Sequence, residues 1–177
     1  MSEGSIELSR EVNVVRIPSG DSLSIPAGTA VVITQALGDS FTVVIPSQPG
    51  LYRIAGEDAD ALGRAKAEVA HDGGSTLEES IWNRLKNCYD PEIPVDIVDL
   101  GLIYSLDVQD HADGAAVSVK MTLTAPGCGM GPAIAEDAKR NILAVPGVAS
   151  ADVQLTWDPP WSPDRISGAG REKLGMV

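Results

Sequence analysis

The sequence contains few of the residues that most catalytic and binding sites require. Of its 177 residues, two are cysteines and two are histidines, and 13 Lys and Arg stand against 25 Asp and Glu. Cys88 and Cys128 form no C-x-x-C pair, which argues against a disulfide scaffold or a structural zinc site and suits a reducing compartment. The net charge of -12, without any Lys/Arg cluster, argues against binding to nucleic acid or to anionic membranes.

Targeting segments and common catalytic motifs are also missing from the sequence. The first stretch, MSEGSIELSREVNVVRIPSG, contains neither a signal-peptide core nor a transmembrane run, so we expect a soluble, cytoplasmic protein. No P-loop, dinucleotide fingerprint, H-E-x-x-H helix or Ser-His-Asp order occurs. With 44% hydrophobic residues, the chain is expected to fold, as one domain or two small ones.

The N-terminal part, residues 1–70, has the pattern of a small β-rich module. Short β-type runs, VNVVRI, LSIP, TAVVIT, FTVVIP and LYRI, alternate with Gly- and Pro-rich turns. Few large apolar side chains are present beyond Phe41, Leu51 and Tyr52. We therefore expect a thin core whose stability depends on packing against the rest of the protein. Residues 57–69 predict a short helix, and residues 71–75, HDGGS, predict a flexible domain boundary.

The second part, residues 76–177, predicts the order helix, strand, strand, helix, strand. Thr76 and Glu79 have the spacing of a capping box, and the helix that they open is expected to end at Pro91. The predicted buried positions are Leu100, Leu102, Tyr104, Leu106 and Val108 in the first strand, and Val117, Val119, Met121 and Leu123 in the second, with Ser118, Lys120 and Thr122 on its wet face.

The remaining elements follow the same reasoning. A helix beginning near Pro132 is expected to bury Ile134, Ala138, Ile142 and Val145. A third strand, parallel to the second, is expected to point Ala151, Val153, Leu155 and Trp157 inward. Residues 162–175 predict a last short helix, weakened by Gly168 and Gly170. The predicted fold class is therefore α/β (α+β), a two-layer domain preceded by the β-rich module.

Cys128 is the main candidate for chemistry. It lies between a strand and the helix that begins near Pro132, where the helix dipole would lower the pKa of a thiol. Gly127, Gly129 and Gly131 flank it and permit close approach of a partner or an ion. In a structural interpretation the glycines form only a turn and the thiol is a small apolar filler. Cys88, at helical spacing from Ile81 and Leu85, is predicted to be core.

The acidic loop, residues 90–101, is the second candidate segment. DPEIPVDIVDLG contains four acids and two prolines, and its acids either cap backbone groups or gather negative charge. For Asp96 and Asp99 the capping role is preferred. A contact between Glu92 and Cys128 would place a carboxylate beside a thiol and assist metal binding.

These motifs resemble a known family. DPEIPVDIVDLGLIY, the Gly-flanked cysteine and WDPPWSPDRIS occur in the order found in the small domain shared by PaaD-type maturation proteins and the eukaryotic cytosolic iron-sulfur targeting factor. The resemblance covers residues 76–177. PSGDSLSIPAGT, ITQALGDSFTV and LYRIAGEDADALG resemble one branch of that family, the SufT proteins.

The resemblance implies a non-enzymatic role in assembling, carrying or delivering iron-sulfur clusters, with SUF assembly proteins and client apoproteins as partners. The family's Asp-Pro-Glu signature falls on Asp90, Pro91 and Glu92, and its single cysteine falls on Cys128. A cluster needs about four thiolate-type ligands, so no firmly bound cofactor is expected. A transient cluster or iron ion could be shared by a homodimer, each subunit lending Cys128.

Two alternatives remain at this point. The first is a thiol-dependent enzyme in which Cys128 is the nucleophile and His71 or His111 the base. The second is a purely structural adaptor, which predicts an ordinary thiol pKa for Cys128.

Overall fold

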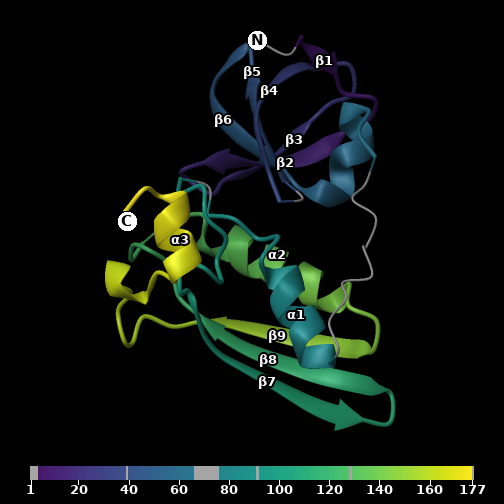
Figure 1. The fold of residues 1–177 in the computed structure, drawn as a ribbon. Coiled ribbons are helices and arrows are strands. Elements are labelled where there is room, and N and C mark those ends of the chain that lie inside the picture. Colours follow the sequence, from purple (N-terminus) through teal and green to yellow (C-terminus); the bar gives the residue numbers. More distant parts are fainter. Residues whose placement is uncertain (1–3, 39, 66–75, 91, 128, 177) are drawn as a thin grey trace. The chain divides into compact units, whose positions relative to one another are not determined.

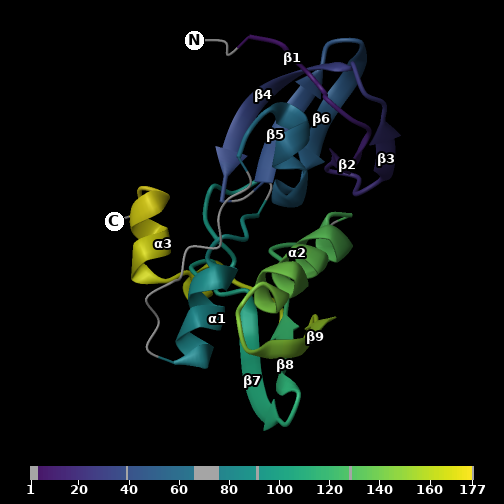
Figure 2. The same cartoon turned by 90° about the vertical axis from the view of Figure 1, so that its right-hand side faces the viewer.

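The computed structural model describes residues 4–38, 40–65, 76–90, 92–127 and 129–176. The chain divides into two compact units, residues 1–70 and residues 71–177. Figures 1 and 2 show the elements of each unit, and we describe the units separately. The predicted boundary segment, residues 71–75, lies outside the described residues and stays a prediction.

Unit 1 is a six-stranded antiparallel sheet in the order β1-β4-β5-β6-β2-β3. The β-type runs of the sequence form the strands, because turn residues such as Gly20 and Gly28, both at positive φ, separate them. The bounds are β1 Ile6–Glu7, β2 Val12–Ile17, β3 Ser22–Ile25, β4 Ala30–Leu37, β5 Ser40–Ile45 and β6 Gln48–Ile54.

The core of unit 1 is built from its own strands and from the segment that follows them. Tyr52 is 2% exposed and Phe41 packs against this core, as expected. Leu51 was wrongly predicted to be core, since it is 42% exposed. Successive residues of a strand point to opposite faces, so burying Tyr52 turns Leu51 outward. The buried cluster comprises Leu8, Val12, Val14, Ile25, Val31, Val43, Ile45, Tyr52, Ile54, Ala61 and Leu62.

The helix predicted for residues 57–69 is wrong in type and in length. A 3-10 helix, η1, spans Gly56–Leu62 and ends because Gly63 takes a left-handed conformation at φ 66°. Arg10 anchors this segment through ion pairs with Asp58 (2.7 Å) and Asp60 (2.9 Å).

Unit 2 begins with α1, Leu77–Leu85. Thr76 is its N-cap, and the Glu79 N–H donates to Thr76 Oγ1 (3.2 Å), which confirms the predicted cap. The expected end at Pro91 is wrong. The helix stops at Leu85, and the N–H groups of Asn87 and Cys88 bond three residues back, to Arg84 and Leu85.

The predicted hairpin is confirmed as β7, Ile103–His111, paired antiparallel with β8, Gly114–Met121. Val117, Val119 and Met121 are buried while Ser118 and Lys120 are exposed, as the alternation indicates. Other details were wrong. Tyr104, Leu106 and Val108, predicted to be buried, are only half-buried. Leu100 and Leu102 are buried but precede the strand, and Thr122 is fully buried because the chain leaves the sheet after Met121.

A helix and a parallel strand complete this sheet. α2, Gly131–Leu143, buries Ile134, Ala138 and Ile142 as expected, and Val145 is buried just beyond its end. Asp137 and Asn141 are unexpectedly buried with them. β9, Val148–Leu155, pairs parallel with β8, so the sheet order is β7-β8-β9. Both α1 and α2 lie on one face of this sheet (Figures 1 and 2). Trp157, predicted inward, lies beyond β9 and is 44% exposed.

The C-terminal segment forms η2, Pro163–Arg165, and α3, Gly168–Lys173. Ser167 caps α3 by accepting from the Gly170 N–H (3.0 Å). The predicted fold class is therefore confirmed, a β-rich N-terminal unit followed by a two-layer α+β unit of the expected element order.

Candidate functional site

The acidic loop begins immediately after α1, where Cys88 is 1% exposed and belongs to the core as predicted. Its Sγ accepts a hydrogen bond from Asn141 Nδ2 of α2 (3.2 Å). The Ile97 N–H donates to the Cys88 carbonyl (2.9 Å), and Tyr89 pairs with Asp96 in an isolated bridge. These contacts fold the loop back on itself beside the end of α1.

Asp90 shapes the turn that carries Glu92. Its side chain is buried, and its Oδ1 accepts from the N–H groups of Glu92 (2.9 Å) and Ile93 (3.1 Å). A carboxylate that satisfies two backbone donors holds a turn rather than serving as a free ligand. Glu92 is exposed, so of these two predicted site residues Glu92 is the one open to a partner. Pro91 lies outside the described residues.

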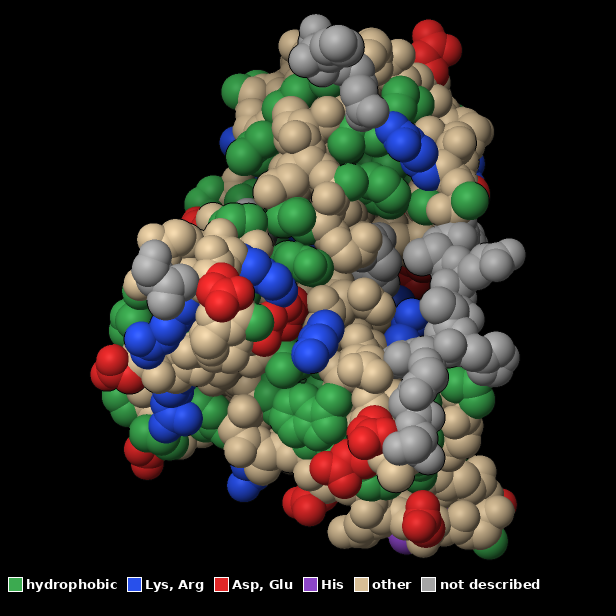
Figure 3. All heavy atoms as spheres, viewed as in Figure 1, with side chains coloured by type: hydrophobic (Ala, Val, Ile, Leu, Met, Phe, Trp, Pro, Cys, Tyr) green, Lys and Arg blue, Asp and Glu red, His purple; other side chains and the backbone are tan. Residues whose placement is uncertain are grey.

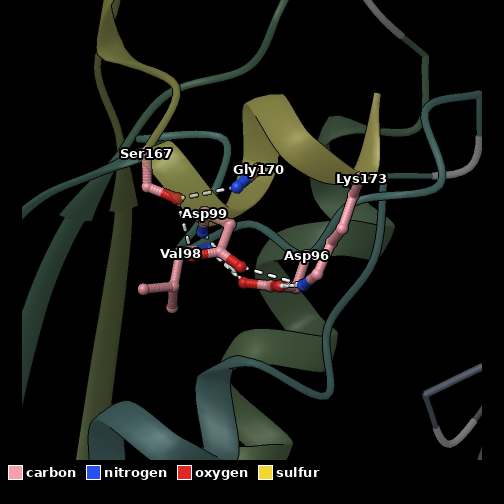
Figure 4. Close-up of polar contacts among 6 residues, drawn as sticks. All are labelled: Asp96, Val98, Asp99, Ser167, Gly170 and Lys173. Carbon is pink, nitrogen blue, oxygen red and sulfur yellow. Dashed lines mark hydrogen bonds and ion pairs between the residues drawn. The ribbon is translucent and has the colours of Figure 1, made fainter. Parts of the chain in front are cut away.

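Asp96 and Asp99 form the charged centre of the loop (Figure 4). Asp96 Oδ1 accepts from the N–H groups of Val98 (3.1 Å) and Asp99 (2.9 Å), which is the preferred capping role. Both carboxylates also bind Lys173 Nζ, Asp96 Oδ2 at 3.1 Å and Asp99 Oδ2 at 2.9 Å. Sequence reasoning missed this pairing because Lys173 is 74 and 77 positions away and no local pattern connects them.

The electrostatics follow from these contacts. Burial opposes ionisation of Asp99, but hydrogen bonds from Lys173 and Ser167 outweigh it and hold the pKa of Asp99 below its ordinary value of 3.8. The hydrogen bonds from Lys173 to Asp99 and Asp96 stabilise its ammonium form by more than burial destabilises it. They raise the pKa of Lys173 above its ordinary value of 10.5. Near neutral pH Asp99 and Lys173 therefore form a charged pair.

The C-terminal segment packs against the other end of the acidic loop. Trp161 Nε1 donates to the Leu100 carbonyl (2.7 Å), and the Ser167 N–H donates to the Asp99 carbonyl (2.8 Å). A Cβ on Gly101, which has φ +70°, would overlap the Arg165 carbonyl oxygen. Gly101 is thus required both by its backbone angle and by the close approach of residue 165.

The glycine-rich loop, residues 124–131, leads into α2. Gly127 and Gly129 are exposed, and no described atom lies within 4 Å of a Cβ placed on Gly127. Gly131 has a packing role, because its Cβ would lie 2.7 Å from Leu123 Cδ1. Within the described residues, the N-cap Met130 makes no side-chain cap and the first turn of α2 contains no acid. Cys128 lies outside the described residues.

The two loops adjoin at the C-terminal end of β8. The Thr122 N–H donates to the Leu102 carbonyl (2.9 Å). Leu102 directly follows the acidic loop, and Thr122 lies two positions before the glycine-rich loop. A Glu92–Cys128 contact stays a prediction. His111 pairs with Gly114 at the opposite end of β8, roughly 23 Å along the strand from Met121. His71 lies outside the described residues.

The described residues contain neither a metal-binding cluster nor a membrane-spanning helix. No group of three or more His, Cys, Asp and Glu side chains is arranged to hold a metal ion. No described helix has the length and apolar character needed to span a bilayer.

On the face in Figure 3, basic side chains are interspersed with acidic ones.

Comparisons with known proteins give the family. The model for iron-sulfur cluster assembly proteins matches residues 78–154, within unit 2. An Fe-S protein maturation auxiliary factor of Porphyromonas gingivalis is 45% identical over 100 residues, which are 56% of this chain and 92% of the relative. The Staphylococcus aureus factor SufT is 39% identical over 87 residues, 49% of this chain and 96% of the relative.

A solved structure agrees with these relatives. A domain of unknown function from Bacillus anthracis has a TM-score of 0.50 and 36% identity, covering 57% of this chain and 93% of that domain. The chain belongs to the iron-sulfur cluster assembly family of Fe-S protein maturation factors, as its motifs predicted. The likeness of residues 1–70 to the SufT branch stays a prediction.

Proposed function

We propose that this member of the iron-sulfur assembly family is a non-enzymatic delivery factor. Its glycine-rich loop would contact a cluster, an iron ion or a carrier protein through Cys128, and Glu92 would be the exposed carboxylate beside it. Family membership, with the matched residues 78–154 containing both loops, carries the proposal. The cytoplasmic location expected from the sequence is part of it.

The geometry of the described residues supports a role for the start of α2. Because Met130 provides no side-chain cap and the first turn lacks acids, a thiolate at this end would meet backbone N–H groups without competition from a nearby carboxylate. Cys128 precedes Met130 by two positions in the sequence. With about four thiolate-type ligands needed for a cluster, one cysteine per chain favours transient binding completed by a second subunit or a client.

The thiol-enzyme alternative has less support. A general base must lie within hydrogen-bonding reach of its nucleophile. His111 is at the far end of β8 from the residue at which the glycine-rich loop begins. The adaptor alternative remains, and the experiment below separates it from the delivery role.

The test is anaerobic reconstitution of the full chain with ferrous iron and sulfide, followed by visible absorbance and iron per subunit. Cys128→Ala is compared with wild type, and Cys88→Ala serves as the matched control because Cys88 is the other cysteine and is buried. We expect colour and iron to be lost in Cys128→Ala and retained in Cys88→Ala. Sedimentation before and after loading tests the shared-cluster homodimer.

Other outcomes are equally informative. If the wild-type protein binds no iron, Cys128 is at most a contact for a partner protein. If Cys128→Ala also matured a client apoprotein as well as wild type does, the thiol role would be wrong and the adaptor alternative would stand.

A further inference from the structure

α3 is held in place by the acidic loop rather than by its own helical propensity. It spans only Gly168–Lys173, far shorter than an isolated helix needs to be stable. At its N-terminal end, Ser167 Oγ donates to Asp99 Oδ1 (2.8 Å). At its C-terminal end, Lys173 reaches both Asp96 and Asp99, so the helix lies across the loop with a polar contact at each end (Figure 4).

The fit between α3 and the loop is close. A Cβ on Gly170 would lie 2.9 Å from the Asp99 carbonyl oxygen and 2.8 Å from Ile166 Cγ2. Gly170 is buried and donates its N–H to Ser167. The helix therefore meets the loop backbone directly, with no side chain between them at this point.

The Lys173 contact continues through the loop to the Asp90 turn. Asp96 is paired with Tyr89 by an isolated bridge, and the Asp90 N–H donates to the Val95 carbonyl (3.4 Å). Residues 89–90 and 95–96 thus lie side by side, joined by this single bridge. Asp90 in turn holds the N–H groups of Glu92 and Ile93.

We propose that Lys173 is a positioning residue for the turn in which Asp90 holds the Glu92 and Ile93 N–H groups. α3 acts as a clasp, because the Lys173 ammonium group at its end keeps the bridge between Asp96 and Tyr89 closed. The effect on iron-sulfur chemistry rests on the proposed function, whereas the effect on the turn does not.

The physical reason is the burial of Asp96. Its side chain is 2% exposed, while that of Lys173 is 44% exposed. Removing the ammonium leaves a buried carboxylate with backbone N–H partners but without the cation that offsets its charge. The carboxylate regains water if the loop opens, and opening separates Asp96 from Tyr89 and Val95 from Asp90.

The experiment measures hydrogen exchange of the Glu92 and Ile93 amides by NMR in the full chain. In Lys173→Met we expect protection of these two amides to fall about tenfold, equivalent to roughly 1.4 kcal/mol in a local opening equilibrium. The Ile134 amide of α2, which donates to Met130, is the internal reference and is expected to be unchanged. Lys173→Arg keeps the charge and is expected to restore most of the protection.

A matched control exists in unit 1. Arg10 also pairs with two aspartates, Asp58 and Asp60, and Arg10→Met removes an equivalent cation without touching the clasp. We expect it to leave Glu92 and Ile93 protection unchanged. If Lys173→Met fails to fold, Lys173→Gln, which keeps a polar side chain but removes the cation from Asp96, is expected to show the same local loss.

The outcomes are separable. Unchanged Glu92 and Ile93 protection in Lys173→Met, or an equal loss at Ile134, overturns the positioning role. If Lys173→Met loses amide protection but binds as much iron as wild type, Lys173 still positions the turn, but the turn has no part in iron binding. If wild type binds no iron while Lys173→Met still loses protection, the proposed iron contact is wrong and the clasp stands.

Discussion

The substitution Gly101→Ala tests how tightly the C-terminal segment is packed on the acidic loop. Gly101 has φ +70°, and its added Cβ would overlap the Arg165 carbonyl oxygen and lie 2.8 Å from Arg165 Cβ. The left-handed conformation costs an alanine roughly 1–2 kcal/mol. Shifting the residue 165 backbone adds about 1–3 kcal/mol, the usual range for overpacking. We therefore expect a total loss of roughly 2–5 kcal/mol in the free energy of unfolding.

Gly175→Ala is the matched control. Gly175 has φ +67°, almost the same backbone angle, but no described atom lies within 4 Å of its added Cβ. The control therefore carries only the conformational cost, roughly 1–2 kcal/mol. The difference between the two variants isolates the close approach of residue 165.

The assay is urea unfolding followed by tryptophan fluorescence. All three tryptophans, Trp82, Trp157 and Trp161, lie in unit 2, so the signal reports the unit that contains both glycines. Equal m-values would show that the variants differ in stability rather than in the surface exposed on unfolding. Equal losses in Gly101→Ala and Gly175→Ala would refute the argument that residue 165 blocks a side chain at position 101.

Two further predictions use the same signal. Thr76→Ala removes the cap of α1 and is expected to cost about 1 kcal/mol, whereas Thr76→Ser keeps the hydroxyl and should cost much less; similar losses would contradict the cap. The pKa of Asp99 is lowered in the folded state, so its contribution to stability is complete above pH 3.8 and is lost as the pH falls through the folded-state pKa. The pKa of Lys173 is raised, so its contribution to stability is complete below pH 10.5 and is lost only at higher pH. The stability difference between wild type and Lys173→Met should therefore be constant from about pH 5 to pH 10 and shrink below about pH 4, and a difference independent of pH in acid would exclude this ion pair as its source.

Several features were predictable because their causes are local in the chain. The cap of α1 depends on Thr76 and Glu79, three positions apart, and the stripe of α2 depends on a period that its own residues set. The alternation of Val117, Ser118 and Val119 likewise follows from strand geometry. The family was readable for the same reason, since its motifs are short contiguous segments.

The errors fall where burial depends on neighbours outside the element. Thr122 and Trp157 continue the alternation of their strands in the sequence, but the strands end at Met121 and Leu155, so the pattern no longer decides which side is covered. Beyond Leu85, the Asn87 and Cys88 N–H groups bond three residues back while the Cys88 carbonyl accepts from Ile97 of the acidic loop, and no helical pattern encodes that change.

The sequence alone determined the order of the main helices and strands of unit 2, the family and the positions of the two candidate loops. The tertiary structure decided that Asp90 holds a turn while Glu92 is exposed, that His111 lies far from the start of the glycine-rich loop, and that Lys173 pairs with both Asp96 and Asp99. Periodicity and capping involve residues only a few positions apart, so they can be recognised in the sequence. Ion pairs between residues more than 70 positions apart depend on how the chain folds back, and they become visible only in three dimensions.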